Sequence, residues 1–132
     1  MNVLVTGATS LLGRSVVGRL VGRGDTVSGL QRPPCGLGVT EHLGDITDQQ
    51  VVASSMAGAE AVVHLAARGA VTGPWADFEA VNGHGTRNVV EAARAAAVRR
   101  FVQVSSPSVA YHGQSLIGSP AQPADPFRAR GH

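Results

Sequence analysis

The sequence predicts an α/β protein built on a doubly wound, parallel sheet of five strands in the order 3-2-1-4-5. Three observations favour this fold class. Apolar runs of strand length alternate with segments of helical periodicity along most of the 132 residues. The first run, 2–5, breaks at Thr6-Gly7 into a short turn that opens an amphipathic segment. The run at 61–65 has the apolar character of a strand that helices cover on both faces.

Each predicted element has a local reason in the chain. Pro33 and Pro34 end the second strand, because proline cannot continue a ladder of hydrogen bonds. The predicted strands are 2–5, 26–30, 39–43, 61–65 and 101–104, and the predicted helices are 11–21, about 48–56 and 75–97, the last with a soft middle at Gly83 and Gly85. Right-handed crossovers then place a ligand over the carboxyl ends of strands 1, 2, 4 and 5.

Composition narrows the classes of function. The net charge is only +2, and the eleven basic residues, all arginines, are scattered, so we expect no nucleic-acid partner. Cys35 is the only cysteine, which leaves no disulfide or thiolate metal site, and we predict no metal site. The start of the chain has neither a basic region before its apolar run nor a run long enough for a membrane span, so we expect a cytoplasmic protein without membrane contact.

The turn after the first strand has the spacing Gly7-x-x-Ser10-x-x-Gly13. Gly7 would make the tight turn, and Gly13 would let the helix pack closely on the strand. Ser10 is small and could donate its hydroxyl to a phosphate at the helix N-terminus. The alternative is a glycine-rich turn with no ligand. The predicted ligand contacts of this stretch are Gly7, Thr9, Ser10, Leu11, Leu12 and Gly13.

Gln31 and Arg32 close the second strand, where an NAD-specific domain places an acidic residue on the ribose 2′-hydroxyl. Neither residue is acidic. The planar fork of Arg32 suits the oxygens of a 2′-phosphate, which favours NADP over NAD, although NAD stays possible. The alternative is that Arg32 is a solvated loop residue.

Two further stretches follow predicted strands. Asp45 could accept a hydrogen bond from the adenine amine while Ile46 packs on the ring, or Asp45 could simply be a turn acid before a helix. The small residues of the stretch Leu65, Ala66, Ala67 and Arg68 would let the ribose and nicotinamide half of a cofactor lie against the backbone. His64 is interpreted as a packed or hydrogen-bonded core histidine rather than a catalytic one.

Five stretches together resemble the extended short-chain dehydrogenase/reductase family, which includes NAD-dependent epimerases and dehydratases and 3β-hydroxysteroid dehydrogenase-like enzymes. They are Val5-Thr6-Gly7-x-x-Ser10-x-x-Gly13, Gly44-Asp45-Ile46-Thr-Asp48, Val63-His64-Leu65-Ala66-Ala67, Val81-Asn82-x-x-Gly85-Thr86-x-Asn88 and Arg100-Phe101-Val-x-Val-Ser105-Ser106-x-Ser108-Val109. Their order and spacing match from Met1 to about Val109.

The resemblance implies a Rossmann domain that binds NAD(P) over residues 1–109. It implies that Asn82 steadies the region beside the cofactor and that Ser106 is the catalytic serine. It also implies that Val104 and Ser105 lie near the nicotinamide. The alternative for Ser105 and Ser106 is a pair of hydroxyls that satisfy a strand end.

The chain departs from the family at the Tyr-x-x-x-Lys pair, in which the lysine lowers the pKa of the tyrosine. There is no lysine in the sequence, and the only tyrosine, Tyr111, is followed four positions later by Ser115. Residues 110–132 are therefore expected to form an irregular loop that leads to a missing catalytic helix and substrate region. The chain is interpreted as the amino-terminal part of such an enzyme.

The functional expectation is the NAD(P)-binding part of an oxidoreductase or epimerase that acts on a small hydroxy or keto compound or a sugar nucleotide. The chain itself is expected to be inactive for lack of the Tyr-x-x-x-Lys pair. Relatives pair through helices that include the counterpart of 75–97, so the parent is expected to be a homodimer and the isolated chain to show reduced stability or association. The alternative is a non-catalytic NADP-binding redox-sensor module.

Overall fold

The computed structural model describes residues 1–69 and 72–106. Ser108, Val109, Tyr111 and the loop predicted at 110–132 lie outside the described residues, and so does the predicted domain boundary at 109. None of the helices within the described ranges is long and apolar enough to cross a membrane.

The sheet has five parallel strands in the order β3-β2-β1-β4-β5, as the sequence predicts. The strands are β1 (Asn2–Thr6), β2 (Thr26–Gln31), β3 (Thr40–Leu43), β4 (Ala61–His64) and β5 (Arg100–Gln103). Thr6 pairs with Leu30 of β2 on one side and with His64 of β4 on the other. The carboxyl ends of these three strands therefore finish at one edge of the sheet.

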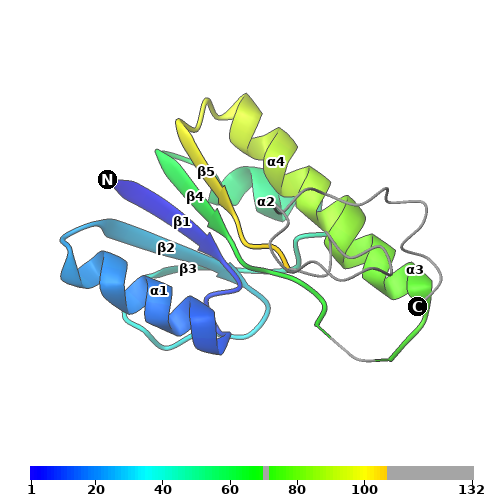
Figure 1. Cartoon of the computed structure of the whole chain (residues 1–132). Coiled ribbons are helices and arrows are strands. Elements are labelled where there is room, and N and C mark those ends of the chain that lie inside the picture. The colour runs from blue at the N-terminus through cyan, green and yellow to red at the C-terminus, as the bar shows by residue number, and fades with distance from the viewer. Residues whose placement is uncertain (70–71, 107–132) are drawn as a thin grey trace, which may run out of the picture.

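Helices cover both faces of the sheet (Figure 1), with α1 (Leu11–Gly22) on one side and α2 (Gln49–Ser55) and α4 (Thr86–Ala95) on the other. Alternate residues of β1 belong to two separate apolar clusters, because successive side chains of a strand point to opposite faces. Val3 and Val5 lie in the cluster of Val17 from α1, whereas Leu4 lies in the cluster of Val89 from α4. The chain thus forms the doubly wound arrangement that the alternation predicts.

The predicted long helix is continuous but changes its pitch. It consists of α3 (Trp75–Phe78), the π-helical segment η1 (Glu79–Gly85) and α4. The soft middle predicted at Gly83 and Gly85 is therefore a stretch of wider turns and not a break. The helix ends at Ala95, two residues before the predicted end, and Ala97 adopts a left-handed φ of 53°.

Several strand ends differ from the prediction by one residue. β4 ends at His64 and β5 ends at Gln103, so Leu65 and Val104 lie in the loops beyond them. β1 continues to Thr6 because that residue still pairs with strands on both sides. The shifts matter at the ligand edge, since they place Leu65 in a loop whose backbone faces the β1–α1 turn.

Candidate cofactor-binding site

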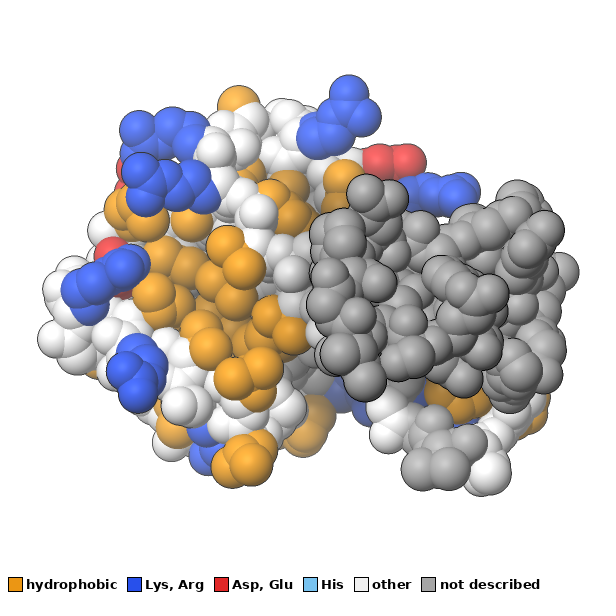
Figure 2. Space-filling model, in the orientation of Figure 1, with side chains coloured by type: hydrophobic (Ala, Val, Ile, Leu, Met, Phe, Trp, Pro, Cys, Tyr) orange, Lys and Arg blue, Asp and Glu red, His pale blue; other side chains and the backbone are white. Residues whose placement is uncertain are grey.

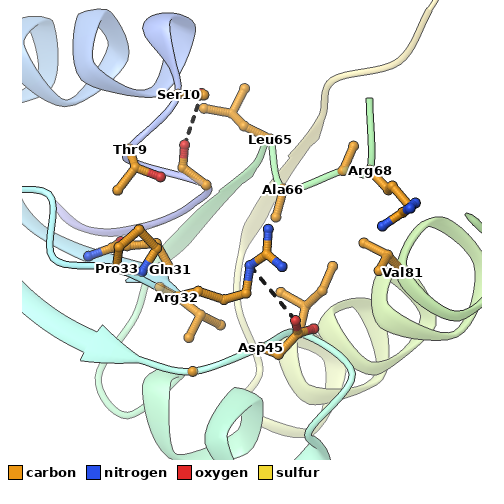
Figure 3. A pocket seen from close by; sticks show the side chains of 15 residues that line it. Thr9, Ser10, Gln31, Arg32, Pro33, Asp45, Leu65, Ala66, Arg68 and Val81 are labelled. Atoms are coloured by element: carbon orange, nitrogen blue, oxygen red, sulfur yellow. Dashed lines mark hydrogen bonds and ion pairs between the residues drawn. The ribbon is translucent and has the colours of Figure 1, made fainter. Parts of the chain in front are cut away.

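A cavity of about 300 Å³ opens at the carboxyl edge of the sheet. It is lined by predicted cofactor residues, namely Gly7, Thr9, Ser10, Gln31, Arg32, Asp45, Ile46, Leu65, Ala66, Ala67 and Arg68, and also by Leu30, Pro33, Gly44 and Val81. In Figure 3, Thr9, Gln31 and Pro33 lie on one side of the cavity and Arg68 and Val81 on the other. Stretches far apart in the chain therefore meet here.

The cavity differs from the predicted ligand edge in one strand. The described lining includes the loop after β3 and no residue from β5 or the segment that follows it. The physical reason is the register, since Gln31 pairs with Leu43 and the β3 loop begins beside the end of β2. The sequence did not single out Leu30, Pro33, Gly44 and Val81 as contacts, although they line the cavity. Gly44 and Val81 belong to stretches that match the family, which was a weak signal of their place at the site.

Gly7 and Gly13 have the structural roles that the sequence predicts. Gly7 has a φ of 74°, and a Cβ there would lie 2.9 Å from the backbone nitrogen of Ala66. A Cβ on Gly13 would lie 2.3 Å from the carbonyl oxygen of Gly7. Both glycines are needed for the close approach of the turn, the first helix and the loop after β4.

Ser10 is the N-cap of α1, and this differs from its predicted role. Its Oγ accepts the N–H of Gly13 at 2.9 Å and donates to the carbonyl oxygen of Gly7 at 2.9 Å. The first N–H groups of a helix have no partner within the helix, and a serine hydroxyl satisfies one of them. The hydroxyl hydrogen predicted for a phosphate therefore goes to the Gly7 carbonyl in this structure.

The remaining residues of the predicted β1–α1 contact set lie outside the cavity lining. The side chains of Leu11 and Leu12 are exposed at the start of α1, and Gly13 is buried behind the turn. Leu11 and Leu12 belong to the first turn of α1, whose buried residues are Gly13 and Val17. Their cofactor contacts stay predictions.

The end of β2 carries one buried amide and one exposed cation. The Gln31 side chain is only 5% exposed, and neither its Nε2 nor its Oε1 has a hydrogen-bond partner of good geometry, although the amide approaches the Glu41 carboxylate. The Arg32 side chain is 79% exposed and places Nε 4.0 Å from Oδ2 of Asp45 (Figure 3). The other oxygen of Asp45 accepts from the backbone N–H and the hydroxyl of Thr47.

Asp45 is therefore both a turn acid and a member of the cavity wall. Oδ1 holds the turn before α2, while Oδ2 faces Arg32. Beside it, Ile46 is buried, and its backbone oxygen accepts from the Asn88 amide at 3.0 Å. The helix η1–α4 thus fixes the loop after β3.

The loop after β4 is fixed by Asn82, which lies behind the cavity wall and not in its lining. The Asn82 amide accepts the N–H of Arg68 at 2.8 Å and donates to the carbonyl oxygen of Arg68 at 3.2 Å. The Arg68 guanidinium lies 3.3 Å from Asp77 and 5.3 Å from the centre of the Phe78 ring. Its buried Nε has no acceptor among the described residues, so this arginine has unused hydrogen-bonding capacity beside the cavity.

His64 is a buried, hydrogen-bonded core histidine, as the sequence predicts. Its ring nitrogens lie 2.6 Å from Thr6 Oγ1 and 3.0 Å from Thr86 Oγ1. Burial lowers its pKa from 6.5 to about 4. The imidazole does not line the cavity, but it contacts the strand end that carries the cavity wall.

The residues after β5 lie outside the described lining. The backbone N–H of Val104 donates to the carbonyl oxygen of His64 at 3.1 Å, and Ser105 and Ser106 are exposed. Their cofactor and catalytic roles stay predictions. Within residues 1–69 and 72–106, no three His, Cys, Asp or Glu side chains gather closely enough to hold a metal ion.

Comparison with known proteins assigns the family. The chain matches the NAD dependent epimerase/dehydratase family over residues 3–131. It belongs to that family. Its five parallel strands in the order 3-2-1-4-5 are the Rossmann-type sheet of the members with known structures. The cavity lies at the carboxyl edge of that sheet.

Relatives within and around the family carry oxidoreductase and epimerase names. The chain is 36% identical over 126 residues to a 3-beta-hydroxysteroid dehydrogenase of Mycolicibacterium neoaurum, which covers 87% of this chain and 34% of that protein. It is 36% identical over 115 residues to a 2-alkyl-3-oxoalkanoate reductase of Stenotrophomonas maltophilia, covering 84% of this chain and 35% of the relative. The chain therefore spans about a third of the length of these curated relatives.

Two solved structures share the fold, and each of those proteins holds NAD. A short-chain dehydrogenase/reductase superfamily protein from Agrobacterium tumefaciens with bound NAD superposes with a TM-score of 0.81 at 36% identity, covering 97% of this chain and 41% of the other. A UDP-glucose 4-epimerase of Thermus thermophilus in complex with NAD superposes with a TM-score of 0.79 at 29% identity, covering 98% and 47%.

The described residues fit a dinucleotide of the kind these proteins hold. The turn at Gly7 has no room for a side chain, because the Leu65–Ala66 backbone fills that space, so the turn and the loop after β4 close together beside the cavity. The N-terminus of α1 lies at the same edge, since α1 follows β1 after a short turn, and a helix N-terminus favours phosphate groups. The buried Nε of Arg68, a residue of the lining, has no acceptor among the described residues, and a polar ligand group could supply one.

Proposed function

We propose that the cavity binds NAD(P) and that the chain is the cofactor-binding part of an oxidoreductase or epimerase acting on a small hydroxy or keto compound or a sugar nucleotide. The observation that carries this proposal is the close approach of the Gly7 turn to the Leu65–Ala66 backbone around one cavity. A bound dinucleotide would supply a hydride acceptor or donor. The chain's own residues bind and orient it.

Each part of the lining has a role in this proposal. The Gly7–Gly13 turn and the N-terminus of α1 hold the pyrophosphate with backbone N–H groups. Asp45 and Ile46 hold the adenine. The stretch 65–68, kept in place by Asn82, lies along the ribose and nicotinamide half, together with Val104 and Ser105. Ser106 hydrogen-bonds the substrate oxygen.

We also propose that NADP is preferred to NAD. The end of β2 has no carboxylate to accept from a ribose 2′-hydroxyl, whereas Arg32 is an exposed guanidinium with one long ion pair to Asp45. An arginine fork binds phosphate oxygens in pairs. The solved relatives described above hold NAD, so the preference is a property proposed for this chain alone.

The test is a calorimetric titration of the purified chain with NADPH and with NADH. We expect NADPH to bind more tightly, and Arg32→Ala to weaken NADPH binding about tenfold or more while NADH binding stays unchanged. Arg19→Ala, a change on α1 away from the cavity, is the matched control. Equal loss for both cofactors in Arg32→Ala would contradict the preference, and no binding of either at millimolar concentration would contradict the cofactor site itself.

The 132 residues contain no match to the family's Tyr-x-x-x-Lys pair, because they contain no lysine. We therefore propose that this chain alone has negligible dehydrogenase turnover even when it binds cofactor. Sustained NADPH oxidation with a panel of small ketones would contradict this. The redox-sensor alternative has no observation of its own in its favour.

A further inference from the structure

Thr6 lies at the centre of a buried hydrogen-bond network beneath the cavity. Its side chain is fully buried, and its Oγ1 accepts the backbone N–H groups of Leu65 at 3.2 Å and Ala66 at 3.1 Å. A hydroxyl has two acceptor lone pairs and one hydrogen to donate. Both acceptor positions face N–H groups, that of Leu65 being shared with the carbonyl oxygen of Thr6 at 3.2 Å, which leaves the hydrogen of Thr6 Oγ1 for Nδ1 of His64, 2.6 Å away.

This donation fixes the tautomer of His64. A ring nitrogen that accepts a hydrogen bond carries no hydrogen, so a neutral imidazole at this position has its hydrogen on Nε2. Nε2 lies 3.0 Å from Thr86 Oγ1 and donates to it. The neighbours of the ring on β1, α4 and β5 are Thr6, Thr86 and Phe101, and none of these side chains is charged.

The two ends of the network are parts of the cavity wall and of its support. At one end, Leu65 and Ala66 line the cavity, and Ala66 lies so close to Gly7 that no Cβ fits between them. At the other end, Thr86 is the first residue of α4, directly after η1. Asn82 in η1 binds the backbone of Arg68, so the same helix holds both ends of the stretch 65–68.

We propose that His64 is a positioning residue of the dinucleotide site, which in its Nε2–H form couples the Leu65–Ala66 turn, through Thr6, to Thr86 at the junction of η1 and α4. The proposal rests on the proposed cofactor function. It goes beyond a packed core histidine, because it assigns a direction to each hydrogen bond and makes cofactor affinity depend on a helix residue that does not line the cavity.

The first experiment needs no ligand. The nitrogen chemical shifts of the five histidines are measured by two-dimensional ¹H–¹⁵N NMR, with His64→Gln to assign the signal. We expect Nδ1 of His64 at the shift of an unprotonated ring nitrogen and Nε2 at that of a protonated one. The reverse assignment, or fast exchange between the two tautomers, would overturn the proposal.

The second experiment removes the distant hydroxyl. Thr86→Val keeps a β-branched side chain of similar volume, and we expect about tenfold weaker NADPH binding and faster hydrogen exchange of the Leu65 and Ala66 amides. Thr86→Ser restores the hydroxyl and should recover both values. Unchanged affinity and exchange in Thr86→Val would overturn the coupling.

A control separates positioning from general loss of stability. Val27→Ala creates a cavity in the other apolar cluster, near the amino ends of the strands, where Val27 pairs with Val3 and does not line the cofactor cavity. It should lower the melting temperature at least as much as Thr86→Val and leave the NADPH affinity unchanged. Equal losses of affinity in both variants would show that His64 has only a structural role. If wild type binds no dinucleotide, the proposed function fails. The nitrogen shifts of His64 and the exchange rates of the Leu65 and Ala66 amides would still show whether the hydrogen-bond network exists as described.

Discussion

Two glycines of α1 occupy opposite environments five residues apart. A Cβ on Gly13 would lie 2.3 Å from the carbonyl oxygen of Gly7 and 2.8 Å from Cα of Ala8, both of them backbone atoms that cannot move independently. A Cβ on Gly18 would meet nothing within 4 Å. The same substitution in one helix therefore tests whether the turn at the cavity is as tight as the structure indicates.

We predict that Gly13→Ala and Gly18→Ala have opposite effects on stability. Gly13→Ala should lower the free energy of unfolding by about 2 kcal/mol or more, because the added methyl group displaces the Gly7 turn. Gly18→Ala should raise it by about 0.5–1 kcal/mol, because alanine loses less backbone entropy in a helix. Urea unfolding followed by circular dichroism measures both, and similar values for the two variants would contradict the prediction.

His64 makes stability depend on pH in a known direction. Its pKa is 6.5 as an ordinary histidine and about 4 in the folded chain, where burial favours the neutral ring. The unfolded state therefore binds a proton first as the pH falls. The stabilising contribution of the neutral His64 ring is therefore complete above pH 6.5, falls below that pH, and is lost as the pH falls through 4.

We predict that wild type loses up to about 3 kcal/mol of stability from this group between pH 6.5 and pH 4. His64→Gln, which cannot titrate, should be less stable at pH 7 but show a flatter profile over that range. Urea unfolding at half-unit pH intervals gives the free energy of unfolding against pH for each protein. Subtracting one curve from the other cancels the contribution of the carboxylates, which both proteins share. Parallel curves would contradict the assignment.

At the scale of elements, the helix from Trp75 to Ala95 mainly supports the site and contributes Val81 to its lining. Besides the ion pair of Asp77 with Arg68, its polar contacts include Asn82 with the loop after β4, Thr86 with His64 and Asn88 with the loop after β3. These positions span the change from π-helical to α-helical turns. The wider turns of η1 set the angle between the first contact and the other two.

We predict that deletion of Gly83 weakens cofactor binding at least tenfold and lowers the melting temperature. Removing one residue changes the separation of Asn82 and Thr86 from four residues to three, so the two side chains lose the relative directions they have in the wider turns of η1 and cannot both reach their partners. Gly83→Ala is the control, since its Cβ would approach only Glu79 Cγ at 3.7 Å. A deletion variant with normal NADPH affinity would contradict the role of the π-helical segment.

The strand order could be predicted because it depends on alternation along the whole chain, to which many residues contribute. The hydrogen-bond partners of individual polar side chains could not be predicted, because they depend on which residues the fold brings close to each of them. Gln31 folds back over Gly29, where a Cβ would lie 2.6 Å from its Oε1, and the sequence gives no sign of that direction. Ser10 was expected to donate to a ligand, but its hydroxyl caps α1.

The two partners of Arg68 and the π-helical turns were equally beyond prediction. Glycines at 83 and 85 indicate a weak point in a helix, yet they do not say whether it breaks, bends or widens. Asp77 and Phe78 contact Arg68 although they lie nine and ten residues later in the chain, and no local pattern indicates that pairing. By contrast, the tight turn at Gly7 could be predicted, since few other residues fit a positive φ.

At the scale of the whole molecule, the described sheet has two edge strands, β3 and β5, each paired on one side only. β5 pairs only with β4 among the described residues, and Val102 in it is 53% exposed. Figure 2 shows hydrophobic side chains gathered near the middle of the face seen in Figure 1, with arginines around them. Exposed apolar residues on an edge strand promote pairing between chains.

We predict that the isolated chain associates as its concentration rises. Val102→Thr keeps a β-branched residue in the strand while removing apolar surface, so it should shift the association to higher concentration. Val21→Thr on α1 is the control, with a similar exposure of 49% in the wild type. Sedimentation velocity over a hundredfold concentration range measures this, and a strictly monomeric wild type would contradict it.

The reactivity of Cys35 can report how often the connection between β2 and β3 opens, because the thiol is buried there. The only thiol of the chain is 2% exposed, burial raises its pKa, and its S–H donates to Glu41 across the connection between β2 and β3. A thiol in this state reacts slowly, because the thiolate is the reactive form. The labelling rate with a disulfide reagent should therefore follow the opening of that connection, and a cofactor bound at the neighbouring end of β2 should protect Cys35 in proportion to its occupancy.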